Sequence, residues 1–403
     1  MTFSVLCVSK DILIGKEKVQ GIDRMSKLLH LNGGTLNDFS VLFPLKNNIV
    51  EYIQNSDSDT IIIMSDGEYE TNTIIKNAVC DALELELVIN KSLEKTILEY
   101  EPNIDTLSLK NELCIPQNAS VLVNPYGYLQ GWLLQDRKDI FFFENSTDVI
   151  NYTLTNSVVP FLRKSLKKSF ECTQIKMFGL RESDAREALA STISQFDEII
   201  FEFYQDYQVL DLVLRYASDL SQAYVSDCIS FIYQKLRKFI VTNDDTSIYQ
   251  LALDLLTISN RTLCLYETVT AGNIAQSLAD CKGVSKHLIE HSEVGFAPQN
   301  VIKNLELNPT IINQYGYVSV NVAYEIAGVL LDKTKCDIIL VTLGDLENDN
   351  MCYTAVGDND GIHIYKSKIN SEKDAKKVLS DTAIFYLIKK LKQNDLYFNK
   401  IIV

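Results

Sequence analysis

The chain has 403 residues, of which 46% are hydrophobic and 23% are charged, and its formal net charge is -15. This length predicts two or three domains, each large enough to bury a hydrophobic core. The acidic balance argues against nucleic acid as a partner, because binding to a phosphate backbone needs a basic surface. No apolar run approaches the roughly 18 residues of a membrane-spanning helix, so we expect no membrane association.

Nine cysteines are scattered along the sequence without a C-x-x-C pair or a zinc-type cluster. Several of them lie inside apolar runs, such as Cys7 in SVLCV and Cys264 in TLCLY. Free cysteine commonly packs as a small hydrophobic residue, so we expect reduced, buried thiols. The first residues, MTFSVLCVSKDILIG, show no basic leader and no cleavage site. Together these features predict a cytoplasmic protein.

Residues 1–165 alternate between expected strands and expected helices, which predicts an α/β domain with a mostly parallel sheet. The run Thr60–Ser65 (TIIIMS) is almost entirely apolar, as in a strand that a parallel sheet buries on both faces. The other elements expected here are strands at 3–9, 120–124 and 139–144, helices at 21–31 and 71–83, and a helix capped by Ser146.

A basic segment, RKSLKK at 163–168, marks the first expected boundary, and we interpret it as a solvated linker in preference to a binding patch. Residues 170–245 then predict a small α+β domain. Residues 247–403 alternate again and predict a second α/β domain. The elements expected after the boundary are strands at 174–178, 198–204, 336–343, 351–356 and 361–365, helices starting at 183, 247 and 371, and a helix through 231–239.

The most informative stretch is 261–278, RTLCLYETVTAGNIAQSL. Its first part has the β-branched and apolar composition of a strand, and residues 273–278 open a helix. Between them Thr270, Ala271 and Gly272 are small enough for close backbone approach. A strand that leads through such a turn into a helix can place a reactive group or a phosphate at the helix N-terminus.

The order of motifs resembles the competence/damage-inducible CinA family over nearly the whole chain. The resemblance implies a molybdopterin-binding-like domain at 1–165, a KH-like domain at 170–245 and a domain related to nicotinamide mononucleotide deamidase at 247–403. It therefore implies two three-layer α/β domains joined by a small α+β domain, and it implies a homodimer. The matching motifs are DILIG at 11–15, NPYG at 124–127, FGLRES at 178–183, YETVTAG at 266–272 and YGYVS at 315–319.

The first pocket that the resemblance implies departs from the family pattern. Where the family has a glycine-rich T-G-G-x-G-P-T loop that cradles a phosphate, residues 64–70 read MSDGEYE. A carboxylate about 4 Å from a phosphate costs roughly 1 to 4 kcal/mol at surface-like dielectrics, so Asp66, Glu68 and Glu70 disfavour ADP-ribose there. We prefer a solvated acidic loop to the alternative, in which these carboxylates hold magnesium, manganese or cobalt. The vestigial pocket would comprise Ser65, Gly67, Asn124 and Gly127.

The second implied pocket departs in the same way. The resemblance puts the nucleophilic serine of A-E-S-C-T-G-G at Thr268, whose extra methyl group crowds an attack. The family's tyrosine and lysine would fall within 293–307, where the sequence has no tyrosine and only Lys303. The vestigial pocket would comprise Thr270, Gly272, Gly344 and Lys377.

The segment His287–His291 (HLIEH) matches an H-x-x-E-H zinc pattern. No third ligand is marked out, so we prefer two surface histidines and expect no metal site. A weaker alternative is that one of these histidines replaces the missing base for Thr268.

Two functional hypotheses result. The first is a non-catalytic nucleotide-related binding, regulatory or scaffold protein with both active sites degraded and no certain cofactor. The second is a divergent nicotinamide mononucleotide amidohydrolase, an ADP-ribose pyrophosphatase, or both. Nicotinamide mononucleotide and ADP-ribose are the candidate ligands in either case.

Overall fold

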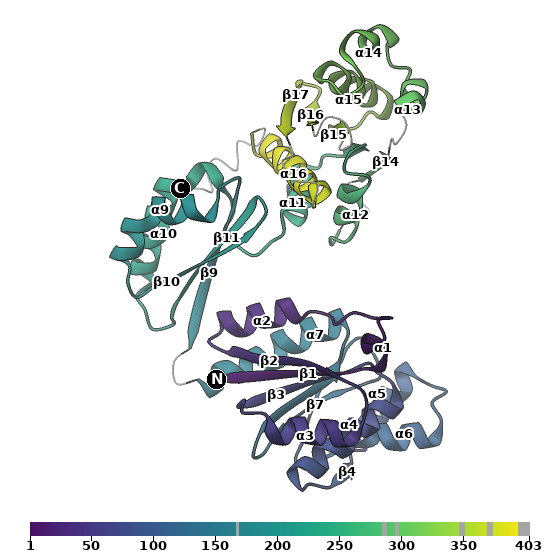
Figure 1. Ribbon diagram of the computed structural model, residues 1–403, viewed down its shortest axis with the longest axis vertical. Helices are drawn as coiled ribbons and strands as arrows, with labels where there is room; N and C mark the ends of the chain where they lie inside the picture. The colour runs from purple at the N-terminus through teal and green to yellow at the C-terminus, as the bar shows by residue number, and fades with distance from the viewer. Residues whose placement is uncertain (167–168, 284–287, 295–297, 346–350, 369–373, 394–403) are drawn as a thin grey trace. The chain divides into compact units, whose positions relative to one another are not determined.

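The computed structural model describes residues 1–166, 169–283, 288–294, 298–345, 351–368 and 374–393 (Figure 1). The chain divides into two compact units. The N-terminal unit contains 1–172 with 198–200 and 214–225, and the C-terminal unit contains 173–197, 201–213 and 226–403. The protein is a multidomain mixed α/β protein whose two larger sheets contain parallel strands, as the sequence predicts. The three domain boundaries given above stay predictions.

The N-terminal unit is built on a six-stranded sheet with the order β2-β1-β3-β8-β7-β6. Strands β2, β1, β3 and β8 are parallel, and β7 and β6 continue the sheet antiparallel. The bounds are β1 Thr2–Val8, β2 Thr35–Leu42, β3 Thr60–Ser65, β6 Ser120–Leu122, β7 Gly131–Gln135 and β8 Asp139–Glu144.

Strand β3 lies at the centre of this sheet and is buried over its whole length. Ile61 and Ile63 belong to the core beneath helices α3 (Lys46–Asn55) and α4 (Tyr69–Leu83). Ile62 and Met64 belong to the core beneath α2 (Ile22–Leu31) and α7 (Thr147–Thr153) on the opposite face. Alternation of side chains along the strand therefore explains why TIIIMS is apolar at consecutive positions.

The remaining elements of this unit are short. A two-stranded sheet pairs β4 with β5. The bounds are α1 Lys10–Leu13, β4 Leu87–Ile89, α5 Leu93–Tyr100, α6 Thr106–Leu113, β5 Cys114–Pro116, a π-helical turn Leu154–Val158 and α8 Val159–Ser165.

The prediction that the basic segment 163–168 is a linker is wrong for residues 163–165, which are helical. Helix α8 carries the chain to Ser165 because Leu162 is fully buried against the sheet. Arg163 donates from Nε to Oδ1 of Asn32 at 2.8 Å.

A four-stranded sheet with the order β10-β11-β9-β12 follows in the sequence. Strand β11 was missed because the β10–β11 turn has no glycine; Tyr207 adopts a φ of 54° in its place. The bounds are β9 Phe170–Phe178, α9 Glu182–Gln195, β10 Ile200–Asp206, β11 Val209–Ala217, α10 Gln222–Leu236, a 3-10 turn Arg237–Phe239 and β12 Ile240–Thr242.

The C-terminal unit contains a five-stranded sheet with the order β14-β13-β15-β16-β17. Strand β13 is parallel to β14 and β15, whereas β16 pairs antiparallel with both β15 and β17. The bounds are β13 Leu263–Glu267, β14 Leu288–Val294, β15 Ile338–Asp345, β16 Met351–Asp358 and β17 Gly361–Lys368.

Helices cover both faces of this sheet, which gives the expected three layers. One core joins the sheet to α11, α12 and α16, and the other joins it to α15. Helix α11 is capped by Ser247, whose side chain accepts from the amide of Gln250 at 3.1 Å. The bounds are α11 Ile248–Ser259, α12 Asn273–Ala279, α13 Pro298–Leu305, α14 Pro309–Tyr315, α15 Val320–Thr334 and α16 Ala375–Gln393. Within the described ranges, no helix is both long and apolar enough to cross a membrane.

Candidate functional site

The turn after β13 is organised by the buried carboxylate of Glu267. Its Oε2 accepts from the amide of Ile274 at 3.1 Å, and its Oε1 accepts from the amide of Ala275 at 2.9 Å. Thr270 adds a third hydrogen bond from Oγ1 to Oε2 at 2.7 Å. The carboxylate thus satisfies amides in the first turn of α12 and places negative charge at the positive end of the helix dipole.

Thr268, the expected nucleophile, lies next to this turn and is only 8% exposed. Its Oγ1 donates to the carbonyl of Thr342 at 3.0 Å and accepts from the amide of Gly344 at 3.0 Å. A hydroxyl has a single proton, and here that proton is directed at a backbone carbonyl, which cannot act as a base. The hydroxyl therefore bridges the end of β13 to β15.

The two glycines of the second predicted pocket have backbone reasons for being glycine. Gly272 adopts a φ of 85°, next to Ala271 at 53°. A Cβ on Gly344 would come within 2.6 Å of the carbonyl oxygen of Met351 on β16. Both positions are therefore explained by local geometry, without a bound phosphate.

The two lysines of the second predicted pocket lie away from the Thr268 hydroxyl. The Lys377 Nζ lies 2.5 Å from Oδ2 of Asp206 and 3.7 Å from Oδ2 of Asp381, and it lies over the ring of Tyr207. Lys303 is exposed on α13. Among the contacts of the described residues, none joins either lysine to Thr268.

The histidine pattern falls at the limit of what the structure describes. His287 lies outside the described residues, and of His291 only the backbone is described, within β14. An extended backbone at His291 does not give the one-turn helical spacing that the zinc pattern uses. In the ranges given above, no group of three or more histidine, cysteine or acidic side chains is arranged to hold a metal ion.

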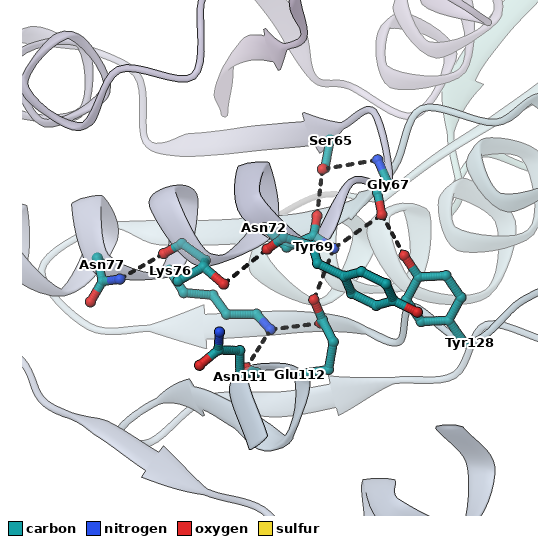
Figure 2. Close-up of polar contacts among 10 residues, drawn as sticks. Ser65, Gly67, Tyr69, Asn72, Lys76, Asn77, Asn111, Glu112 and Tyr128 are labelled. Atoms are coloured by element: carbon teal, nitrogen blue, oxygen red, sulfur yellow. Dashed lines mark hydrogen bonds and ion pairs between the residues drawn. The ribbon is translucent and has the colours of Figure 1, made fainter. Parts of the chain in front are cut away.

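The loop between β3 and α4 is the first predicted pocket, and Figure 2 shows its polar contacts. The amide of Gly67 donates to Oγ of Ser65 at 3.1 Å, and that hydroxyl donates to Oδ1 of Asn72 at 2.5 Å. The amide of Glu68 donates to Oδ1 of Asp66 at 3.1 Å. Two amides that a phosphate-binding loop would direct at its ligand are thus used by the loop's own side chains.

Beneath this loop lies a buried ion pair that the sequence analysis missed. Nζ of Lys76 on α4 donates to Oε2 of Glu112 on α6 at 2.8 Å and to the carbonyl of Asn111 at 3.1 Å. The side chains of Lys76 and Glu112 are 2% and 3% exposed. Asn72 donates from Nδ2 to Oε1 of Glu112 at 3.1 Å and so ties the pair to the loop (Figure 2). The only signal in the sequence is a lysine on an otherwise buried helix face.

Several carboxylates lie close to this loop. Burial raises the pKa of Asp66, and the charges of Glu68 and Glu17 raise it further. Burial also raises the pKa of Glu144. A Cβ added to Gly67 would lie 3.5 Å from a carboxylate oxygen of Glu144. Oδ1 of Asp66 accepts from an amide, and in the described part of the chain these carboxylates form no group of three arranged to hold a metal ion.

The polar groups of the Asn124–Gly127 turn form hydrogen bonds with the residues that directly follow it. The amide of Asn124 donates to Oε1 of Gln130 at 2.9 Å, and the Asn124 side chain donates to the carbonyl of Leu129 at 2.9 Å. Gln130 in turn donates from Nε2 to the carbonyl of Gly127 at 3.1 Å. The polar groups of the turn are therefore used internally.

Comparison with known proteins identifies the family. Residues 245–345 match the CinA C-terminal domain. A competence-damage inducible protein of Clostridium botulinum is 21% identical over 356 residues, which cover 85% of this chain and 86% of that protein. A competence-damage inducible protein of Natranaerobius thermophilus is 24% identical over 326 residues, with 76% of each chain covered. Residues 245–345 therefore carry the CinA C-terminal domain, and the matches over most of the chain support a CinA family member.

Solved structures of the CinA superfamily cover a smaller part of the chain. The Escherichia coli protein is 21% identical with a TM-score of 0.34, and it covers 39% of this chain and 96% of its own. CinA from Thermoplasma acidophilum is 16% identical with a TM-score of 0.35, and it covers 38% of this chain and 94% of its own. The predicted family membership is confirmed by the sequence matches, whereas the assignments of site residues stay predictions.

Proposed function

We propose that this CinA-like protein is non-catalytic and acts as a nucleotide-related binding, regulatory or scaffold protein. The observation that carries the proposal is the Thr268 hydroxyl, which donates to the Thr342 carbonyl and accepts from the Gly344 amide. A nucleophile must pass its proton to a base as it attacks. Here attack would break a buried contact between two strands, and the only described acceptor for the hydroxyl proton is a backbone carbonyl.

The N-terminal unit supports the same proposal independently. Its loop uses the amides of Gly67 and Glu68 internally, and Asp66 and Glu144 add negative charge beside them. A pyrophosphate would have to displace these hydrogen bonds and overcome repulsion of roughly 1 to 4 kcal/mol for each nearby carboxylate. We therefore propose that ADP-ribose cleavage is lost as well.

The competing proposal is a divergent nicotinamide mononucleotide amidohydrolase. The observation in its favour is the intact turn after β13, where Glu267, Thr270 and Gly272 keep the start of α12 in place. Such an enzyme would need a base for Thr268 from 284–301, whose side chains lie outside the described residues.

The partners in this proposal follow from the family resemblance. We propose a cytoplasmic homodimer that meets nicotinamide mononucleotide or ADP-ribose as a ligand and does not bind nucleic acid or membranes. Sedimentation at several protein concentrations tests the dimer, and a monomer at all of them would contradict it.

Activity assays test the proposal. We expect no ammonia from nicotinamide mononucleotide, and no cleavage of ADP-ribose with magnesium, manganese or cobalt. Calorimetry with the same nucleotides then separates two non-catalytic cases, since binding without turnover indicates a nucleotide sensor. Turnover that disappears in Thr268→Ala or Asp66→Ala would overturn the proposal.

A further inference from the structure

A polar cavity lies away from the turns described above. It has a volume of about 380 Å³ and is formed where the segment 238–241 meets the last turns of α16. Three lysines and four apolar residues line it: Lys238, Lys389 and Lys392, with Ile240, Val241, Phe385 and Ile388. This volume lies within the range of small-molecule sites.

Among the described residues, the lysines of this cavity have no acidic partner, which is unusual in a chain with a net charge of -15. Neighbouring Lys390 pairs with Asp358 at 2.8 Å. In contrast, no ion pair among the described residues involves Lys238, Lys389 or Lys392. Lysines near a helix C-terminus do complement the helix dipole, but that effect does not require them to share a cavity with Lys238.

Lys392 is the most informative of the three. Its Nζ donates to the carbonyl of Val241 at 2.6 Å, and burial lowers the pKa of its ammonium group. A half-buried ammonium group whose contact is a neutral carbonyl is incompletely stabilised, and an anion brought beside it would favour its charged form.

The apolar wall is rigid and has an aromatic component. The Phe385 ring stacks on Phe178 with centroids 4.3 Å apart and an interplanar angle of 11°. Ile388 is 2% exposed, so the floor of the cavity belongs to the packed core. A ligand could therefore bury an apolar group against this wall while its charge faces the lysines.

We infer that this cavity binds a small organic phosphate: a dianionic phosphate group among Lys238, Lys389 and Lys392, with an apolar or aromatic substituent against Ile240 and Phe385. The inference does not rest on the proposed loss of the two family active sites, because it uses none of their residues. Charge-assisted hydrogen bonds supply the affinity for the phosphate, and burial of the substituent supplies the preference for an organic ester.

Calorimetry on the full chain with three probes tests this inference. Phenyl phosphate should bind at least about tenfold more tightly than inorganic phosphate, and phenol should bind more weakly than phenyl phosphate. Lys389→Gln should weaken phenyl phosphate binding about tenfold, since it removes one partner of the dianion. The matched control is Lys376→Gln, an exposed lysine of the same helix outside the cavity, which should leave the affinity unchanged.

Lysine-labelled protein gives an independent readout by NMR. Saturating phenyl phosphate should raise the pH at which the Lys392 side chain titrates, and it should leave the chemical shifts of the Lys376 side chain unchanged. Equal affinity for phenyl phosphate and inorganic phosphate, equal effects of the two glutamine variants, or no binding at millimolar phenyl phosphate would each overturn the inference.

Discussion

The turn after β13 and the loop after β3 each connect the end of a buried strand to the start of a helix, but different contacts hold them in place. Each follows a buried parallel strand and leads into a helix, and each depends on a buried carboxylate. In the first, Glu267 is the last residue of the strand and accepts directly from the amides of α12. In the second, Glu112 comes from α6, acts through Asn72, and has its charge balanced by Lys76.

This difference predicts which substitutions each region can tolerate. Glu267 is stabilised by hydrogen bonds and the dipole of one helix, and no ion pair among the described residues involves it, so its removal leaves no described cation without a partner. Glu112 is half of an ion pair, and removing it leaves the Lys76 ammonium buried without a counter-charge. We therefore expect the N-terminal network to be the more sensitive to single substitutions and the more tolerant of paired ones.

The largest expected effect is in the buried ion pair. Glu112→Leu should lower the free energy of unfolding by about 3 to 5 kcal/mol, because it leaves Lys76 unpaired in the core. The double variant Lys76→Met/Glu112→Leu should recover most of this loss. Fluorescence of Trp132, the single tryptophan of the chain, reports unfolding of the N-terminal unit in urea.

An exposed pair is the control for this experiment. Lys95 and Glu99 lie 3.7 Å apart on α5 with side chains 88% and 61% exposed. Glu99→Leu should change the unfolding free energy by less than about 1 kcal/mol. A double variant at the buried pair that is no more stable than Glu112→Leu would break the contrast between the two regions.

The next effect is at Glu267. Glu267→Ala should lower the free energy of unfolding by about 1 to 3 kcal/mol, since it leaves the amides of Ile274 and Ala275 without their acceptor. Hydrogen exchange at these two amides should accelerate. Glu267→Gln keeps one carbonyl acceptor and should lose less; equal exchange in all three proteins would show that the carboxylate does not hold the helix start.

A smaller effect is expected at Thr268. Thr268→Val keeps the shape but leaves the Gly344 amide unpaired, which should cost about 1 to 2 kcal/mol. Thr268→Ser keeps the hydroxyl and loses one methyl group, at about 0.8 kcal/mol. The two variants are separated by hydrogen exchange at the Gly344 amide, which should accelerate only in Thr268→Val. Protection that persists in Thr268→Val would rule out the bridging hydrogen bond.

The smallest effect depends on pH. The pKa of Asp66 is raised in the folded protein, so the folded state binds this proton more tightly than the unfolded chain does. Stability is therefore lost as the pH rises from the unfolded pKa of about 4 through the raised folded pKa.

Asp66→Asn removes this loss. It should stabilise the N-terminal unit slightly at pH 7, and the gain should vanish near pH 3, where the wild-type carboxyl is protonated in both states. Urea unfolding followed by Trp132 at both pH values measures the difference. A gain that is equal at both would mean that packing, and not charge, is responsible.

The sequence predicted the parts of the fold that depend on local composition. Strands Thr60–Ser65 and Asp139–Glu144 were predicted with their observed ends because their apolar runs stop at polar residues. Strand β11 was missed because Tyr207 replaces the glycine expected in a tight turn. The stretch 261–278 predicted a strand, a tight turn and a helix, which the structure has as β13 and α12, because these elements are adjacent in the sequence.

Contacts between distant segments could not be predicted in the same way. Lys76 and Glu112 are separated by 36 residues, and nothing local marks them as partners. Likewise, the Thr268 hydroxyl meets β15 only because β13 and β15 pair in the sheet, with Glu267 opposite Thr342. The two hydrogen bonds of the Thr268 hydroxyl therefore depend on the pairing of β13 with β15, which the motif alone does not predict.

The central claim is that the Thr268 hydroxyl holds two strands together and does not attack an amide. Ammonia release from nicotinamide mononucleotide, measured on the wild type, Thr268→Ser and Thr268→Val, tests this claim most directly. The account predicts that none of the three releases ammonia above the rate without protein. Release by the wild type that is kept or increased in Thr268→Ser and abolished in a folded Thr268→Val would contradict it.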